Sequence, residues 1–285
     1  SDLYNQNGKL ANCIRSKGSL GSIKDSDISD IVLGEKNLET QRRMLDGEPG
    51  LDCSGCYNLE KNKTSFDIVS DRVFYLKELK QVPLDTYRHG NHDLRSVDIR
   101  WTNLCNFMCV YCSPHFSSRW GEAYPNLNSS ITFDKPDDAQ REEFKNYIFK
   151  HADQLKQVYL AGGEPLLMKE NLEFLQLLYK VNPKVNMRIN TNLSITDTRI
   201  FDEICKFENV HWIISVETMS EEYEYIRYGG VWNNFIRNVS MIQQLNHSEL
   251  RYLALILTKY FQVRSKDHYY PSIRNQLAKS FRHHQ

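Results

Sequence analysis

The sequence predicts an α/β fold of parallel strands, preceded by a small irregular domain that contains cysteines. Two observations lead to this prediction. From about residue 95 short apolar strands alternate with amphipathic helices, whereas the first 90 residues are polar and punctuated by glycine. Alternating strands and helices imply parallel strands joined by right-handed crossovers. We therefore expect two domains, one over residues 1–90 and the other over residues 91–285.

Five strands and four helices can be placed in the second domain. The expected strands lie near Ser96–Thr102, Gln157–Ala161, Val185–Thr191, His211–Val216 and Tyr252–Thr258. The expected helices lie near Asp137–Gln154, Lys169–Tyr179, Asp197–Phe207 and Trp232–Asn246. Pro136 is expected in the first turn of its helix, where proline is favoured. In the first domain only Glu35–Leu45 has a clear helical pattern, so little of that domain can form a core.

Composition and charge exclude several classes of protein. The 285 residues include 36 basic and 36 acidic side chains, a balance that gives no electrostatic reason to expect a nucleic acid or a membrane as partner. No run of about 18 apolar residues occurs. The first residues lack the features of a secretory signal, so the expected location is cytoplasmic. Seven cysteines in such a chain indicate metal or redox chemistry rather than a disulfide framework.

Three cysteines follow the first strand of the second domain with the spacing C-x3-C-x2-C. Cys105, Cys109 and Cys112 can hold three corners of a cubane iron–sulfur cluster, which leaves the fourth iron open to a substrate. A zinc site takes four closed positions, and His115 is available on the same loop as a fourth ligand. Three buried cysteines without any ligand are the remaining alternative. The spacing alone leaves these three interpretations open.

This loop resembles the signature loop of the radical S-adenosylmethionine (SAM) enzymes, both in its spacing and in the aromatic Tyr111 before the last cysteine. The resemblance implies a partial (β/α) barrel of about six parallel strands, one more than can be placed here. It implies a catalytic [4Fe–4S] cluster on Cys105, Cys109 and Cys112, whose open iron chelates SAM. One electron then cleaves SAM to give a 5′-deoxyadenosyl radical that abstracts hydrogen from a substrate, while the protein orients these cofactors.

Gly162, Gly163, Glu164 and Pro165 follow the second expected strand. Alone, this tetrapeptide predicts a turn. In radical SAM enzymes a similar motif at the same topological position contacts the amino group of SAM, and the glycines let the backbone approach a ligand closely. The resemblance therefore implies that these four residues, with Tyr111, belong to the cofactor site.

Polar residues also follow the third and fourth expected strands. Asn192 and Ser194 resemble residues that bind the ribose of SAM, or they cap the helix near Asp197. Glu217 ends an apolar strand, where a carboxylate needs a ligand or a basic partner. Arg227 resembles a family arginine that reaches the SAM carboxylate, because a guanidinium binds a carboxylate bidentately. The alternative is that Arg227 pairs with Glu217 or with a surface acid.

Cys13, Cys53 and Cys56 resemble the cysteines of the auxiliary domains called twitch or SPASM, which are attached to many radical SAM enzymes. The resemblance implies a second iron–sulfur cluster that binds substrate or passes electrons. A small zinc site is the competing interpretation, since thiolates accept either metal. Cys205, on the face of an expected helix, is interpreted as a core residue.

The expected function is that of a radical SAM enzyme acting on a peptide or protein, since relatives with auxiliary clusters often modify these. A small metabolite or a nucleotide is the alternative substrate. An electron donor such as flavodoxin or ferredoxin is the expected partner, and no basic run supports binding of tRNA. The rival from another class is a zinc-stabilised binding module without catalysis.

Overall fold

The computed structural model describes residues 2–6, 8–13, 16–48, 50–61, 70, 72–73, 93–126, 136–245 and 250–253. They belong to two compact units. The first comprises Ser1–Trp101 and Asp134–Val158, and the second comprises Thr102–Phe133 and Tyr159–Gln285. The expected domain boundary near residue 90 lies outside the described residues.

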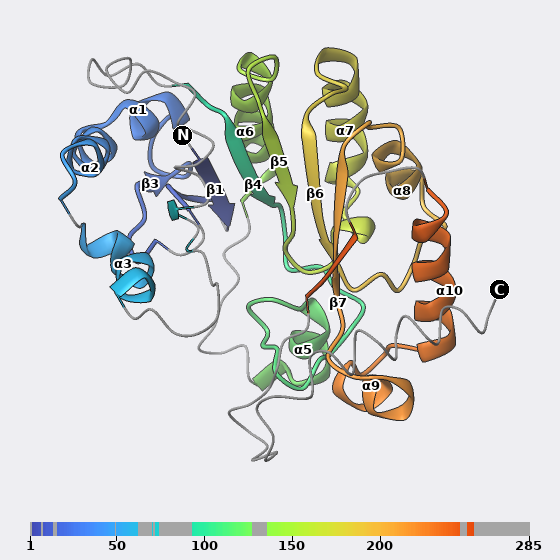
Figure 1. Ribbon diagram of the computed structural model, residues 1–285. Helices are drawn as coiled ribbons and strands as arrows, with labels where there is room; N and C mark the ends of the chain where they lie inside the picture. The colour runs from blue at the N-terminus through green and yellow to red at the C-terminus, as the bar shows by residue number, and fades with distance from the viewer. Residues whose placement is uncertain are drawn as a thin grey trace. The chain divides into compact units, whose positions relative to one another are not determined.

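Four strands of the first unit lie side by side in the order β3, β2, β1, β4 (Figure 1). Their bounds are Asp2–Gln6 for β1, Lys9–Ala11 for β2, Gly21–Ser22 for β3 and Ser96–Arg100 for β4. The β1–β2 and β2–β3 pairs are antiparallel, whereas β1 pairs with β4 in parallel. Strands β1 to β3 were not predicted: β2 and β3 carry too few residues for a period of two to be seen, and the polar β1 is a strand through its pairing with the distant β4.

The helices of the first unit are α1, α2, α3 and α6, and a 3-10 turn, η1, precedes α3. Their bounds are Ile28–Leu33, Glu35–Leu45, Ser54–Lys61, Asp138–Lys150 and, for η1, Leu51–Cys53. The expected helix over Glu35–Leu45 is confirmed. Helices α1 and α3 were not predicted, so the first unit has more regular structure than its polar composition indicates.

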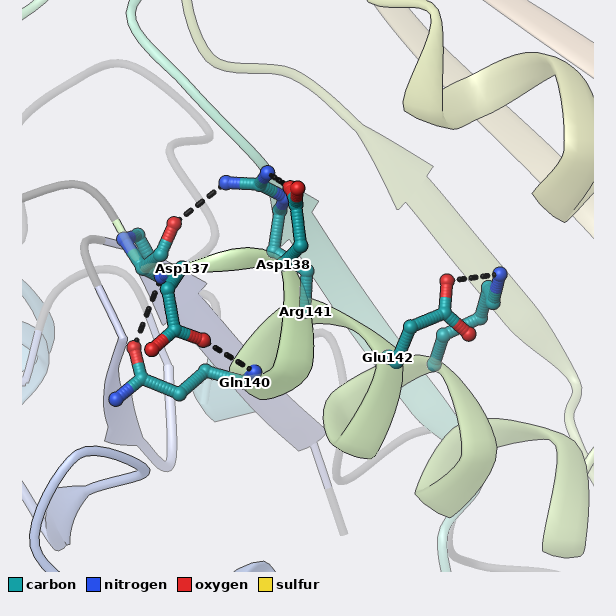
Figure 2. A network of polar contacts seen from close by, with 7 residues as sticks. Asp137, Asp138, Gln140, Arg141 and Glu142 are labelled. Atoms are coloured by element: carbon teal, nitrogen blue, oxygen red, sulfur yellow. Dashed lines mark hydrogen bonds and ion pairs between the residues drawn. The ribbon is translucent and has the colours of Figure 1, made fainter.

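Helix α6 begins with a reciprocal capping box (Figure 2). The Asp137 carboxylate accepts a hydrogen bond from the Gln140 backbone N–H at 2.8 Å, and the Gln140 side chain accepts one from the Asp137 N–H at 3.0 Å. Two N–H groups that have no partner within the helix are satisfied in this way. The expectation for Pro136 is wrong: it precedes the N-cap residue, because the Asp137 side chain rather than the proline ring starts the helix.

The second unit contains the parallel strands β6, β7 and β8, with bounds Asn186–Thr191, Val210–Ser215 and Leu250–Leu253. Strand β5, Gln157–Leu160, runs from the first unit into the second. Four of the five expected strands are found within one or two residues of their expected bounds. The fifth begins two residues earlier than expected, and its expected end near Thr258 lies outside the described residues.

Helices separate these strands along the chain (Figure 1). They are α5 Ser118–Ala123, α7 Glu170–Val181, α8 Arg199–Ile204, α9 Ser220–Ile226 and α10 Trp232–Gln243, with a 3-10 turn, η4, at Pro165–Leu167. Parallel strands joined through helices confirm the predicted α/β class and agree with a partial barrel. Helices α5 and α9 were not predicted, because each is only about two turns long.

One face of β6 and β7 packs against helices. Their buried side chains alternate with half-buried ones along both strands. Trp212 on the buried face contacts the Phe201 ring of α8, with ring centroids 5.4 Å apart. The apolar core between this face and the helices therefore fixes the positions of the strand ends. No helix within the described residues is long and apolar enough to cross a membrane.

Candidate active site

The three cysteines of the predicted triad lie together on one loop of the second unit. Cys109 is buried and Cys105 and Cys112 are half-buried. The thiols are near enough for the charge of each to influence another: Cys109 acts on Cys105, Cys112 on Cys109, and Cys105 on Cys112. Burial raises the pKa of both the Cys105 and the Cys109 thiol to about 11. The loop therefore brings three thiols, all buried or half-buried, to one place.

The start of α5 holds this loop from one side. The Ser117 hydroxyl donates to the Phe107 carbonyl oxygen at 2.6 Å, and the Trp120 indole N–H donates to the Cys109 carbonyl oxygen at 3.0 Å. Within the loop, the Phe107 backbone N–H points at the Cys105 sulfur from 3.5 Å. Such N–H donors favour a thiolate over a thiol.

The segment after α9 holds the loop from another side. The backbone N–H groups of Met108 and Val110 donate to the carbonyl oxygens of Tyr228 and Ile226, each at 2.9 Å. Gly229 has a φ of +101°, and an added Cβ would lie 3.1 Å from the Asn106 carbonyl oxygen. Glycine tolerates both this backbone conformation and the close approach.

The Gly-Gly-Glu-Pro segment after β5 packs directly on the start of the cysteine loop. The Glu164 backbone N–H donates to the Leu104 carbonyl oxygen at 2.7 Å. A Cβ on Gly163 would lie 2.1 Å from that same oxygen, so only glycine fits here. Gly162 has a φ of +117°, which turns the chain away from β5. The tetrapeptide thus supports the cysteine loop and is more than a surface turn.

The Glu164 carboxylate joins the ends of two strands. It is fully buried, and it accepts hydrogen bonds from the Thr191 hydroxyl at 2.6 Å, the Asn192 N–H at 2.7 Å and the Leu166 N–H at 3.1 Å. Burial raises the pKa of Glu164 to about 7, against these three donors, which lower it. The three hydrogen-bond donors to Glu164, one hydroxyl and two backbone N–H groups, are thus all uncharged.

Asn192 and Ser194 face the cysteine loop. The Asn192 amide donates to the Asn106 side-chain oxygen at 3.0 Å and lies 3.9 Å from the Cys105 sulfur. The Asn106 amide donates in turn to the Ser194 hydroxyl at 2.8 Å. The alternative of a helix cap is wrong for these two residues, because Thr198 caps α8 by accepting from the Phe201 N–H. Asn106 was not among the predicted site residues, although it lies between two of the cysteines.

Glu217 and Arg227 form a buried bidentate ion pair. The guanidinium Nε and Nη2 lie 2.7 and 2.6 Å from the two carboxylate oxygens, and both side chains are 4% exposed. Burial lowers the pKa of Arg227, but the hydrogen bonds to Glu217 outweigh burial and raise it. The third nitrogen, Nη1, lies 4.0 Å from the Cys109 sulfur. The ion-pair alternative is therefore the arrangement that the structure shows.

Tyr111 completes this polar group. Its hydroxyl donates to a Glu217 oxygen at 2.9 Å, and the Arg227 guanidinium lies 5.8 Å from its ring centroid. Burial raises the pKa of Tyr111, so the phenol stays protonated and acts as a donor. The aromatic residue before the last cysteine is thus hydrogen-bonded to Glu217, which follows the end of β7.

The donor set fits an iron–sulfur cluster. Within the described ranges, no three or more His, Cys, Asp or Glu side chains are arranged to hold a metal ion. A cubane cluster takes one thiolate at each of its iron corners, so its ligands need not converge on one point as they do around zinc. Donors from Phe107, Asn192 and Arg227 already point at the sulfurs. His115 packs edge-on against Phe116, with centroids 4.7 Å apart.

The N-terminal cysteines lie in the first unit. Cys53 ends η1 and Cys56 is buried in α3, and burial, followed by the charge of Cys56, raises the pKa of Cys53. The chain after Cys13 packs on this segment: a Cβ on Gly18 would lie 2.6 Å from an Asp52 carboxylate oxygen. The folding of this unit thus brings Gly18, five residues after Cys13, to the segment that carries the other two cysteines.

Cys205 lies at the C-terminal cap of α8 and is half-buried. Burial raises the pKa of its thiol to about 11. The interpretation as a core residue is wrong in degree, because the helix ends at this position and leaves the side chain at the edge of the core.

The sequence model of the radical SAM superfamily matches residues 99–258, more than half of the chain. The chain belongs to the radical SAM superfamily. The matched range contains the cysteine triad and all the strand-end residues described above. This membership implies a [4Fe–4S] cluster and SAM as cofactors, and it favours an enzyme over the zinc-stabilised binding module.

Curated relatives match a smaller part of the chain. The GTP 3′,8-cyclase of Nautilia profundicola is 29% identical over 97 residues, which are 34% of this chain and 27% of that protein. The GTP 3′,8-cyclase of Sulfurimonas denitrificans is 27% identical over 128 residues, which are 44% of this chain and 35% of that protein. The chain thus spans about a third of the length of these curated relatives.

Solved structures with a similar arrangement include Streptococcus suis SuiB. Its complex with S-adenosylmethionine is 17% identical, covers 69% of this chain and 42% of SuiB, and gives a TM-score of 0.43. Its complex with the precursor peptide SuiA is 13% identical, covers 76% of this chain and 49% of SuiB, and also gives 0.43.

Proposed function

We propose that this radical SAM enzyme binds its catalytic [4Fe–4S] cluster through Cys105, Cys109 and Cys112 and abstracts hydrogen from a peptide or protein. The observation that carries the proposal is the three thiols on one loop, which three separate segments hold in place. When bound, the cluster and SAM supply a one-electron cleavage that yields the 5′-deoxyadenosyl radical. The residues of the chain hold, orient and shield these groups.

Each segment around the loop has a role in this proposal. Gly162 and Gly163 let their backbone lie against the cysteine loop, where it would meet the amino group of SAM, the Glu164 carboxylate fixes that backbone to the end of β6, and Pro165 begins the η4 turn that follows. Asn192 and Ser194 present amide and hydroxyl groups for the ribose. Glu217 orients Arg227, whose remaining nitrogen lies beside Cys109 and would bind the SAM carboxylate. Tyr111 fixes Glu217 from the loop.

Variants of single cysteines test the catalytic assignment. Protein reconstituted anaerobically with iron and sulfide should form 5′-deoxyadenosine from SAM when a strong reductant is added. Cys105→Ala should abolish this product, whereas Cys205→Ala, which changes a thiol outside the loop, should leave it unchanged. Continued SAM cleavage by the Cys105→Ala variant would contradict the assignment of the triad.

We infer that Cys13, Cys53 and Cys56 bind a second iron–sulfur cluster, as in twitch and SPASM domains. The support is the close packing of Gly18, five residues after Cys13, on Asp52, which precedes Cys53. Cys53→Ala should then lower the iron content by about four atoms per chain if the cluster is a cubane. Unchanged iron, or one zinc lost instead, would remove the second cluster and leave the zinc alternative.

The peptide substrate rests on the auxiliary cysteines, since relatives with auxiliary clusters often modify peptides. A nucleotide is the second candidate, and the identity to the two GTP 3′,8-cyclases favours it. Conversion of GTP by the reconstituted enzyme would support the nucleotide and contradict the peptide. The proposal further includes a flavodoxin or ferredoxin as electron donor and a cytoplasmic location.

A further inference from the structure

The hydroxyl of Tyr223 is buried and has no hydrogen-bond partner within the part of the chain that the structure describes. Tyr223 lies in α9 and is only 1% exposed. Its backbone carbonyl oxygen, in contrast, accepts a hydrogen bond from the Arg227 N–H at 2.8 Å. A buried hydroxyl that bonds neither to protein nor to water is unfavourable, so this side chain requires an explanation.

Packing holds the Tyr223 ring next to the cysteine loop. The ring centroid lies 5.3 Å from that of Trp232 and 4.9 Å from that of Phe235, both in α10. A Cβ on Gly230 would lie 2.9 Å from Cε1 of Tyr223 and 3.2 Å from Cζ of Phe107. Cε1 is bonded to the carbon that carries the hydroxyl. The hydroxyl end of Tyr223 therefore lies close to Phe107, which belongs to the cysteine loop.

The ionisable groups near this phenol belong to the candidate active site. Burial raises the pKa of the Tyr223 phenol, so the hydroxyl stays protonated and can donate. The groups whose charges also act on this pKa are Arg227, Cys109, Glu217 and Glu164. Arg227 has donors only, and each carboxylate already accepts three hydrogen bonds from other groups. The Cys109 sulfur is therefore the acceptor of this set whose strength changes when a cluster binds.

Cys109 gains acceptor strength when it binds iron. Burial raises the pKa of its thiol to about 11, and a thiol sulfur is a weak acceptor. As a cluster ligand the same sulfur is a thiolate, with the negatively charged sulfides of the cluster next to it. Hydrogen bonds to charged acceptors are about twice as strong as those between neutral groups. The hydroxyl that lacks a partner in the cluster-free protein would thus have one in the loaded protein.

We propose that the Tyr223 hydroxyl donates a hydrogen bond to sulfur at the Cys109 corner of the [4Fe–4S] cluster and thereby raises the reduction potential of that cluster. This inference rests on the proposed function, because it concerns the cluster of the same site. The reduced cluster carries one more negative charge than the oxidised one, so a donor stabilises the reduced form more. Tyr223 therefore makes the cluster easier to reduce.

A mediated electrochemical titration of the reconstituted full-length protein tests this hydrogen bond. The electron paramagnetic resonance signal that changes when SAM is added identifies the triad cluster, and the titration is recorded without SAM. Tyr223→Phe keeps the ring and removes the hydroxyl. It should lower the equilibrium constant for reduction about tenfold, which corresponds to a midpoint potential lower by about 59 mV. Tyr225→Phe is the matched control, because Tyr225 lies in the same helix but is 71% exposed, and it should keep the wild-type potential.

Urea unfolding of cluster-free protein gives a second readout. Because the hydroxyl has no partner before the cluster binds, Tyr223→Phe should unfold at the same urea concentration as the wild type or at a higher one. An equal or higher midpoint potential in Tyr223→Phe, or the same decrease in Tyr225→Phe, would overturn the proposal. Unfolding of cluster-free Tyr223→Phe at a lower urea concentration would also overturn it, since the hydroxyl would then have a structural partner. A wild type that takes up no iron would instead contradict the proposed function.

Discussion

Glu164 and Glu217 are both buried carboxylates, but different groups compensate their charges. Glu217 meets a guanidinium with two short hydrogen bonds. Glu164 meets a hydroxyl and two backbone N–H groups, which stabilise its charge less than burial destabilises it. The sequence places both residues at strand ends, but it cannot show which of them has a basic partner, since Arg227 lies ten positions after Glu217 and far along the chain from Glu164.

The raised pKa of Glu164 predicts how stability depends on pH. The folded protein holds this proton more tightly than the unfolded chain, so the stabilisation is complete below the ordinary pKa and is lost as the pH rises through about 7. Between pH 5.5 and 8 the free energy of unfolding should fall by about 2 kcal/mol more in the wild type than in Glu164→Gln. Urea denaturation of cluster-free protein at both pH values measures this difference. Parallel profiles for the two proteins would contradict it.

Replacement of Arg227 should destabilise the folded protein, and a double variant can show that the unpaired charge of Glu217 is the cause. Arg227→Met leaves the Glu217 carboxylate buried without its cation, which costs about 3–5 kcal/mol of the free energy of unfolding. The double variant Glu217→Gln/Arg227→Met removes both charges and should recover a large part of that loss. Denaturant unfolding of the three proteins measures it. A double variant as unstable as Arg227→Met would show that the ion pair is not the source of the loss.

At the scale of elements, the cysteine loop depends on contacts that side chains would block. Gly163→Ala places a methyl group 2.1 Å from the Leu104 carbonyl oxygen, so the loop must move. We expect this variant to lose most of the iron that the triad binds. Gly50→Ala is the control, because a Cβ there meets no atom within 4 Å. Equal iron content in both variants, measured after reconstitution, would show that the contact does not position the loop.

Helix α6 depends on its capping box. Asp137→Ala removes the acceptor for the Gln140 N–H and should lower the free energy of unfolding by about 1 kcal/mol (Figure 2). Asp138→Ala, which leaves the box intact and removes an exposed ion pair with Arg141, should cost less. Chemical denaturation compares the two. A larger loss of stability in Asp138→Ala than in Asp137→Ala would argue against the cap as the main stabilising contact.

For the whole molecule, the sequence predicts the repeating part of the fold better than the rest. Strands β5 to β7 and helices α6, α7, α8 and α10 follow from hydrophobic periodicity, because each one buries one face, whereas β4 is buried along its whole length. Strands β1 to β3 do not, since β1 is defined by its pairing with the distant β4. Within the site, the spacing of the cysteines and glycines can be read from the sequence, and the Arg227–Glu217 pair is one of two alternatives that the sequence leaves open, whereas the Asn106 contacts arise only from folding.

The most direct test of the cysteine triad is an electron paramagnetic resonance spectrum of reduced, reconstituted protein, recorded without and with SAM. The Cys53→Ala variant is the protein to use, because the triad is then the expected site of any cluster. We predict the signal of a reduced [4Fe–4S] cluster, with g values that change when SAM is added, and no such signal after a further Cys105→Ala change. A signal that SAM leaves unchanged, or a triad that takes up zinc and no iron, would contradict the account.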